Sequence, residues 1–174
     1  MLNVNYIEEI NMTNINIPTL SGKTFGIEVE FLTSYYQDDF VDELNRKLRD
    51  ANLSYNEDTG VYEGSDRLVV FDAYYSDTDA TRWRIKTDGS LSGTSEHRHG
   101  LELVSPIMKT EDDVRDFYTI LNAMNEIGVS VNRSCGLHVH IGMDGVSNNS
   151  IHTILERYSQ FESNIDQMMP RSRR

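Results

Sequence analysis

Apolar and polar residues alternate between Thr24 and Thr33, with aliphatic or aromatic side chains at positions 25, 27, 29 and 31. A period of two places neighbouring residues on opposite faces of a β-strand, so this stretch predicts a strand with one apolar face. Similar patterns predict strands over Thr81 to Thr87, over Leu101 to Ser105 before Pro106, and over Leu137 to Ile141 between two glycines.

Three other stretches repeat their apolar residues every three or four positions, which predicts amphipathic helices. The first follows a cap at Asp38 or Asp39 and reaches about Ala51. The second covers Glu111 to Ile127, with Thr110 as its N-cap and Gly128 as its end. The third begins at Asn148 and extends to about Met169, before Pro170.

The order of these elements predicts one domain over residues 23–174, preceded by an asparagine-rich N-terminal arm over residues 1–22. Strands are separated by hairpins as well as by helices, without a regular βαβ rhythm. We therefore expect an α+β fold with a mostly antiparallel sheet. The acidic, tyrosine-rich stretch from Leu53 to Asp79 predicts a surface hairpin or insertion, in which Arg67 to Tyr74 is the only strand-like run.

The net charge of the chain argues against some classes of binding partner. The chain has a net charge of −12, and residues 36–80 carry 12 acidic and 4 basic side chains, so this stretch supplies 8 of the 12 excess charges. A surface this acidic would repel phosphates, which argues against nucleic acid and against an anionic membrane as partners. The single cysteine, Cys135, excludes a disulfide framework. No apolar run is long enough for a membrane span, and no basic residue precedes Lys23, so we expect a cytoplasmic protein.

Ionisable residues repeat at every second position on three of the predicted strands. Glu28 and Glu30 share one face of their strand, His138 and His140 share one face of another, and Glu102 lies opposite Leu101 and Leu103. Residues two apart on a strand lie about 6 to 7 Å apart. If the three strands are neighbours, one sheet face gathers three carboxylates and two imidazoles, a set that suits Mg²⁺ or Mn²⁺. A solvated strand face for the glutamates and a structural histidine pair are the alternatives.

Other polar residues allow two interpretations each. Arg84 and Lys86 could face the same basin and bind an anionic substrate, or they could lie on a solvated face. Asp88 and Ser90 form a turn with Gly89, and His97 and His99 are expected to be solvated in a loop. The terminal arginines, including Arg173, could be a solvated tail or a clamp for phosphates.

Four segments in this order resemble the amidoligase family, which comprises carboxylate-amine ligases related to glutamine synthetase and glutamate-cysteine ligase. They are Phe25-Gly26-Ile27-Glu28-Val29-Glu30-Phe31, then Trp83 with Asp88-Gly89-Ser90-Leu91, then Leu101-Glu102-Leu103-Val104-Ser105-Pro106, and Cys135-Gly136-Leu137-His138-Val139-His140. The resemblance covers residue 24 to the end. Family members usually continue beyond the final arginines, so the comparison implies a domain that is incomplete at its C-terminus and a site that a second chain or an oligomer could complete.

The resemblance implies a glutamine-synthetase-like sheet with helices on one face and an open catalytic face. It also implies that ATP phosphorylates a small-molecule or peptide carboxylate, and that an amine then attacks the acyl phosphate to form an amide. Glu28, Glu30, Glu102 and one or both of His138 and His140 would bind the Mg²⁺ or Mn²⁺ ions. Arg173 would contact the transferred phosphate, Asp88 and Ser90 would line the site, and Arg84 or Lys86 would meet the substrate carboxylate.

Two other functions remain open at this stage. One is a catalytically incomplete module that binds metal or nucleotide without turnover. The other is a metal-dependent hydrolase of amides or phosphoesters, in which water replaces the amine. Dependence on ATP distinguishes the ligase from the hydrolase.

Overall fold

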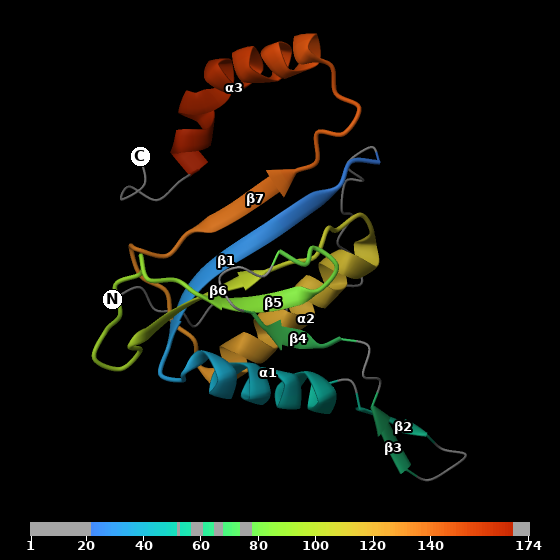
Figure 1. The fold of residues 1–174 in the computed structure, drawn as a ribbon, viewed down its shortest axis with the longest axis vertical. Helices are drawn as coiled ribbons and strands as arrows, with labels where there is room; N and C mark the ends of the chain where they lie inside the picture. The colour runs from blue at the N-terminus through green and yellow to red at the C-terminus, as the bar shows by residue number, and fades with distance from the viewer. Residues whose placement is uncertain (1–21, 52, 57–60, 65–67, 74–77, 169–174) are drawn as a thin grey trace.

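The computed structural model describes residues 22–51, 53–56, 61–64, 68–73 and 78–168, and its centre is a five-stranded sheet (Figure 1). The strand order is β4-β5-β6-β1-β7. Only the β4–β5 pair is parallel among the described strand pairs, so the sheet is mostly antiparallel and the predicted α+β class is confirmed. The strands are β1 (Phe25–Thr33), β4 (Val70–Asp72), β5 (Trp83–Thr87), β6 (His99–Val104) and β7 (Leu137–Ile141).

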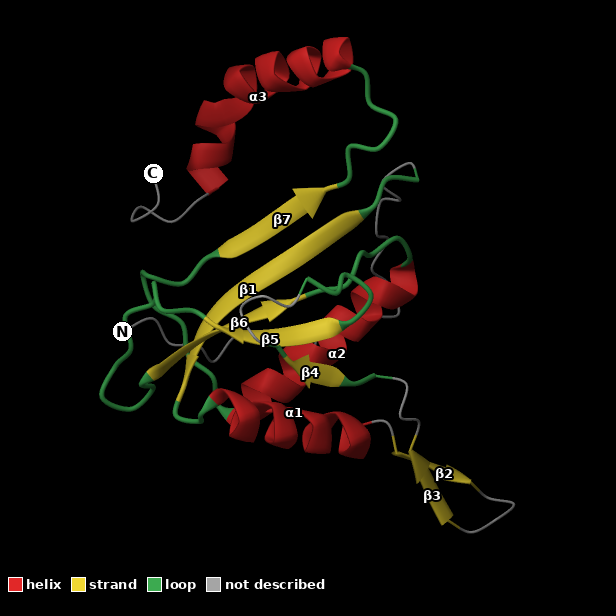
Figure 2. Ribbon diagram, viewed as in Figure 1, coloured by secondary structure: helices red, strands yellow, loops and turns green. Residues whose placement is uncertain are grey.

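Two helices cover one face of this sheet, and the main hydrophobic core lies beneath them (Figure 2). They are α1 (Gln37–Ala51) and α2 (Glu111–Ile127). The core combines the apolar stripes of both helices with the apolar faces of the central strands, and its fully buried members include Phe31, Phe40, Leu44, Ile85, Leu103 and Ile120. Burial on this face leaves the opposite face of the central strands for polar side chains.

The predicted boundaries of α2 are confirmed, because both of its ends carry capping residues. The Thr110 hydroxyl accepts a hydrogen bond from the Asp113 backbone N–H, and the Asp113 carboxylate accepts one from the Thr110 N–H at 2.7 Å. This capping box satisfies N–H groups that the first helical turn leaves without partners. Gly128 ends the helix with a φ of 86°, a left-handed conformation that glycine adopts without steric cost.

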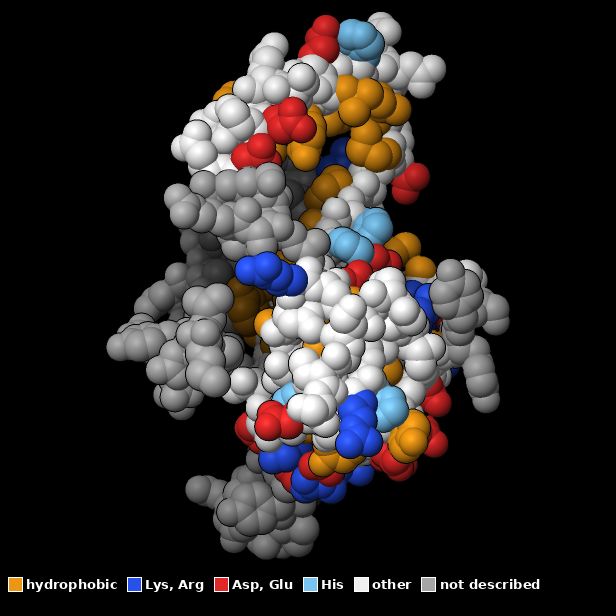
Figure 3. Space-filling view, turned by 90° about the vertical axis from the view of Figure 1, so that its left-hand side faces the viewer, with side chains coloured by type: hydrophobic (Ala, Val, Ile, Leu, Met, Phe, Trp, Pro, Cys, Tyr) orange, Lys and Arg blue, Asp and Glu red, His pale blue; other side chains and the backbone are white. Residues whose placement is uncertain are grey.

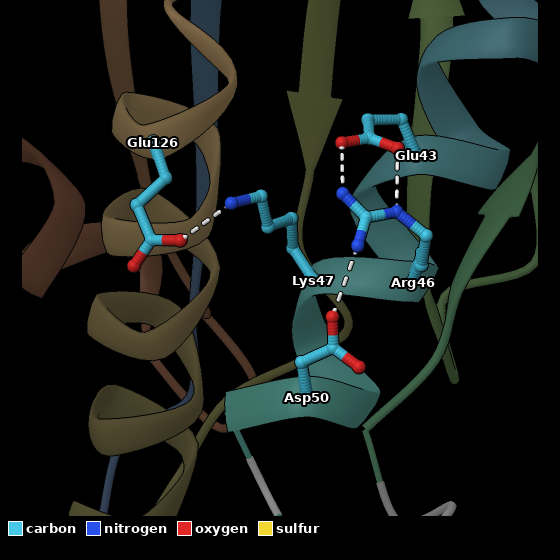
Figure 4. A network of polar contacts seen from close by, with 5 residues as sticks. All are labelled: Glu43, Arg46, Lys47, Asp50 and Glu126. Atoms are coloured by element: carbon cyan, nitrogen blue, oxygen red, sulfur yellow. Dashed lines mark hydrogen bonds and ion pairs between the residues drawn. The ribbon is translucent and has the colours of Figure 1, made fainter.

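Ion pairs join the two covering helices and decorate their outer surface (Figure 4). Lys47 of α1 lies 3.0 Å from Glu126 of α2, while Arg46 lies 2.5 Å from Glu43 and 3.0 Å from Asp50 on its own helix. Such exposed pairs each contribute little to stability, because solvent screens them. The ion pairs of α1 therefore add little to the stability of the fold.

Two boundaries differ from those predicted. Helix α1 begins at Gln37, so Asp38 and Asp39 lie in its first turn, where negative charge stabilises the helix dipole, instead of capping it. Strand β6 begins at His99, whose backbone pairs with Thr33 and whose ring packs 4.4 Å from that of Tyr36. The prediction of a solvated loop position for His99 is therefore wrong.

The acidic segment after α1 contains the predicted surface hairpin, formed by β2 (Leu53–Asn56) and β3 (Val61–Gly64). The strand predicted over residues 67–74 is found as the shorter β4, which pairs with β5. The prediction that it is the only strand of this stretch is wrong, because β2 and β3 form a second pair whose residues show no clear alternation. In Figure 1 the hairpin projects away from the five-stranded sheet.

The third helix, α3 (Asn148–Met168), follows β7 and lies away from the α1–α2 layer (Figure 1). Its predicted apolar stripe is exposed, with 48% of Ile154, 63% of Leu155 and 57% of Tyr158 accessible. Thus only α1 and α2 fulfil the expectation of helices packed on one face. Within the described residues, no helix is sufficiently long and apolar to cross a membrane. The predicted N-terminal arm, except Gly22, and Arg173 lie outside the described residues.

Candidate functional site

Three ionisable side chains from three neighbouring strands meet on the polar face of the sheet. Glu28 lies on the central strand β1, Glu102 on β6 and His138 on β7, and one ligand atom from each lies within 4.8 Å of the others. The register explains the meeting, since Glu28 pairs directly with His138 and Glu30 pairs with Glu102. Figure 3 shows histidine side chains directly beside acidic side chains on this part of the surface. We call Glu28, Glu102 and His138 the metal cluster.

Glu28 is the most connected member of this cluster. Its Oε2 lies 3.2 Å from His138 Nδ1 and 3.1 Å from His140 Nε2. Burial raises the pKa of the Glu28 carboxyl, but hydrogen bonds from His140 and His138 outweigh that effect and leave the pKa below its usual value. Glu28 is therefore a carboxylate at neutral pH, held between two imidazoles.

Glu30 is fixed beside the cluster by the backbone of Gly136. The Glu30 carboxylate accepts a hydrogen bond from the Gly136 N–H at 2.5 Å, and the Glu30 backbone N–H donates to the Gly136 carbonyl at 3.0 Å. Its other carboxylate oxygen lies 3.7 Å from His138 Nε2. A Cβ at position 136 would lie 3.1 Å from both Glu30 Oε2 and His138 Nε2, so a glycine leaves the room that these two side chains need.

The pKa of Glu102 reflects the negative charge that gathers around it on this face of the sheet. Burial raises its pKa, and the nearby negative charges of Glu28, Asp88 and Glu30 raise it further. Two carboxylates and an imidazole form the donor set that Mg²⁺ and Mn²⁺ accept, and a divalent cation would relieve this repulsion. The residues therefore fit the metal that the sequence predicts.

Replacing Glu102 by glutamine should separate two effects of its negative charge, one on the stability of the metal-free fold and one on cation binding. The pKa of Glu102 is raised in the folded state, so the folded chain binds this proton more tightly than the unfolded chain does. The stabilisation that results is present at low pH and is lost as the pH rises through the raised pKa. At pH 7, metal-free Glu102→Gln should therefore unfold about 2 °C above the unmodified chain, a shift that allows for solvent screening. Mn²⁺ should no longer raise its melting temperature.

Differential scanning fluorimetry with and without Mn²⁺ measures both quantities. Glu162→Gln, on the exposed face of α3, is the matched control and should behave as the unmodified chain does. A lower melting temperature for metal-free Glu102→Gln, or full stabilisation of this variant by Mn²⁺, would contradict the assignment.

A cavity of about 550 Å³ adjoins the cluster on the β5–β6 side, and Lys86, Asp88 and Glu102 line it. Lys86 pairs with Glu102 across the strands, which places its cationic side chain on the same face as the metal cluster. The Asp88 carboxylate accepts a hydrogen bond from the Ser90 N–H at 2.8 Å, which confirms the predicted turn. Lys86 and Asp88 line this cavity, whereas Ser90 is exposed and is not among its lining residues. The roles of all three in substrate binding stay predictions.

Arg84 lies on the same strand as Lys86 but is almost fully buried, with 5% of its surface accessible. The alternative of a solvated position for Arg84 is therefore wrong. Its role as a substrate contact stays a prediction, as does the phosphate contact of Arg173.

Gly136 also contributes to the site, although the sequence pattern did not single it out as a site residue. Its N–H holds Glu30, and its missing side chain makes room for His138. The sequence offers one signal for this role, because a glycine directly precedes the strand that carries two histidines. Glycine often marks a place where another group closely approaches the backbone.

Together, the fold and the site define an α+β domain whose open sheet face carries a carboxylate and histidine centre suited to a divalent cation. Residues 21–174 match the family model described as "Putative amidoligase enzyme". The chain therefore belongs to the amidoligase family, as its four sequence segments predicted. A search of curated proteins and a search of solved structures each found no match. The relation to the glutamine synthetase fold stays a prediction.

Proposed function

We propose that this chain is an ATP-dependent carboxylate-amine ligase that forms an amide bond through an acyl phosphate. The observation that carries the proposal is the convergence of Glu28, Glu102 and His138 on an open sheet face, in a member of the amidoligase family. An acidic cluster of this kind would bind Mg²⁺ or Mn²⁺, which in turn makes a triphosphate bindable on a chain with a net charge of −12.

The reaction that we propose has two displacements. A carboxylate oxygen of the substrate attacks the γ-phosphorus of ATP, the bond to the β-phosphate oxygen breaks, and ADP leaves. The amine nitrogen then attacks the acyl carbon, inorganic phosphate leaves, and the nitrogen loses a proton. Positioning and charge neutralisation supply most of the rate enhancement in phosphoryl transfer of this kind.

Each residue of the site has a role in this scheme. Glu28, Glu102 and His138 would hold divalent cations, whose contribution is to neutralise phosphate oxygens. Glu30, fixed by Gly136, completes the negative field around them. Lys86 orients an anionic group of the substrate in the adjoining cavity, and Asp88 in the same cavity accepts the proton that the amine loses.

The direct test is ADP release by the chain with Mg²⁺ and ATP against panels of carboxylates and amines. We expect ADP release that requires both a carboxylate and an amine. With an ¹⁸O-labelled carboxylate, one ¹⁸O should appear in the phosphate. Hydrolysis of an amide or phosphoester without ATP would favour a metal-dependent hydrolase, and MgATP binding without turnover across the panel would favour a catalytically incomplete module. Either result would overturn the ligase assignment.

Lys86→Met should lower turnover about 100-fold, because the methionine keeps much of the side-chain volume but loses the charge that orients the anionic substrate. Its Mn²⁺ affinity should not fall, since the change removes a positive charge beside Glu102. Steady-state ADP release measures the first effect and calorimetric titration the second. Lys109→Met, an exposed lysine outside the sheet, is the control and should keep full turnover. Unchanged turnover in Lys86→Met would remove Lys86 from the scheme.

A further inference from the structure

A second cavity, of about 340 Å³, lies on the opposite side of the metal cluster from Lys86. Its walls come from β1, from the segment after β6 and from the end of β7, and include Gly26, Glu28, Val104, Ser105, Ile107 and His140. Glu28 and His140 border both this cavity and the cluster, where their side chains lie 3.1 Å apart. A ligand whose charged end is bound at the cluster can therefore extend into this space.

Gly26 forms the floor of the cavity, and neither its backbone nor its packing requires a glycine. It lies within β1, directly opposite His140, and its φ is not in the left-handed region. A Cβ at this position would lie 3.6 Å from Ser105 Oγ and 3.9 Å from His140 Cβ, which are ordinary contacts. Glycine weakens a strand, and in a strand interior it often marks a place where a ligand approaches the backbone. The missing side chain keeps the floor of this cavity clear.

The lining favours an uncharged, flat group over an anionic one, because Glu28 and Asp144 each bring a carboxylate to it. Ser105 is already engaged, because its hydroxyl accepts a hydrogen bond from the Ile27 N–H and donates one to the Pro106 carbonyl, both at 2.8 Å. Ile107 is 60% exposed and Met143 is 40% exposed, so both present apolar surface at this site. Apart from Thr24, Glu28, His140 and Asp144, the side chains that line the cavity are apolar or, like Ser105, already hydrogen-bonded. Mostly apolar walls and a volume of a few hundred Å³ are typical of sites for ring-containing ligands.

We propose that this cavity binds the nucleoside part of ATP while the triphosphate lies at the metal cluster. The inference deepens the proposed ligase function and rests on it. The nucleoside is favoured over an apolar arm of the substrate, because Lys86 and Asp88 place the polar, substrate-binding cavity on the other side of the cluster.

Gly26→Val tests the inference, because valine suits a β-strand but fills the floor of the cavity. Calorimetry would compare Mn²⁺ alone, Mn²⁺ with ATP, and Mn²⁺ with inorganic tripolyphosphate, which lacks the nucleoside. We expect ATP to bind about tenfold more weakly to Gly26→Val, since its methyl groups occupy the ligand's space. The affinities for Mn²⁺ and for tripolyphosphate should be unchanged.

Ile107→Ala, on another wall, is a second variant and should also weaken ATP binding without affecting tripolyphosphate. Thr119→Val, on α2, is the control and should leave all three affinities unchanged. Unchanged ATP affinity in Gly26→Val and Ile107→Ala, or equal losses for ATP and tripolyphosphate, would overturn the nucleoside assignment alone. Absence of MnATP binding to the unmodified chain would instead overturn the proposed function itself.

Discussion

Glu28→Gln should abolish tight Mn²⁺ binding, with an affinity at least about 100-fold lower than that of the unmodified chain. Glu28 lies on β1, between the strands that carry Glu102 and His138, and its carboxylate contacts His138 at 3.2 Å and His140 at 3.1 Å. Glutamine keeps the shape of the side chain but removes its negative charge and one metal-binding oxygen. The fold should survive, because Glu28 contributes nothing to the hydrophobic core.

Isothermal titration with Mn²⁺ measures this loss, and the chain contains a matched control. Glu156 of α3 also lies beside a histidine, with 3.5 Å between its carboxylate and His152, yet it stands outside the metal cluster. Glu156→Gln should bind Mn²⁺ as the unmodified chain does. If both variants lost affinity equally, binding would reflect general surface charge, and the cluster would not be the site.

Phe40→Ala should lower the free energy of unfolding by about 3 to 5 kcal/mol, because it leaves a cavity in the core. Phe40 is fully buried on α1, and its ring centroid lies 5.0 Å from that of Phe31 on β1. The loss is a large share of the stability of an ordinary domain. Urea unfolding followed by circular dichroism measures it.

The matched control is Phe161→Ala on α3, where 55% of the phenylalanine is exposed. Its effect should stay within about 0.5 kcal/mol, as for most surface substitutions. A comparable loss at Phe161 would show that α3 packs as tightly as α1, contrary to the exposed stripe described above. Below the unfolding transition, Phe40→Ala should still bind Mn²⁺, since the core and the cluster occupy opposite faces of the sheet.

The central strands and the helix after them were predictable because their patterns are local. Alternation over residues 25–31 and the capping residues of α2 each define an element without reference to the rest of the chain. The metal cluster followed from the same alternation once β6, β1 and β7 were taken as neighbours. Their order in the sheet confirms that assumption.

Other features depend on contacts between distant segments, which periodicity does not encode. The burial of Arg84 depends on the segments that pack around β5, and the contact between the rings of His99 and Tyr36 depends on the pairing of β6 with β1. The hydrogen bond from Gly136 to Glu30 joins residues 106 positions apart. The exposed stripe of α3 is the reverse case, since its pattern alone would suggest a buried face.

The negative charges of the chain are unevenly distributed, and a small group of them explains why the site would bind a cation. Residues 36–80 supply 8 of the 12 excess negative charges, and the acidic residues of α1 among them lie at the surface, where solvent screens them. Glu28, Glu30 and Glu102 instead share one partly buried sheet face, where repulsion raises the pKa of Glu102. This small group, rather than the total charge, is what would attract a divalent cation and, through it, a nucleotide.

Electron spin echo spectroscopy of Mn²⁺ bound to the unmodified chain tests this central claim most directly, because the modulation reports nitrogen coordinated to the ion. We expect ¹⁴N modulation from an imidazole, absent in His138→Gln and present in His152→Gln, whose histidine lies on α3. Modulation that persists in His138→Gln, or a bound Mn²⁺ without any nitrogen ligand, would contradict the assignment of the metal cluster.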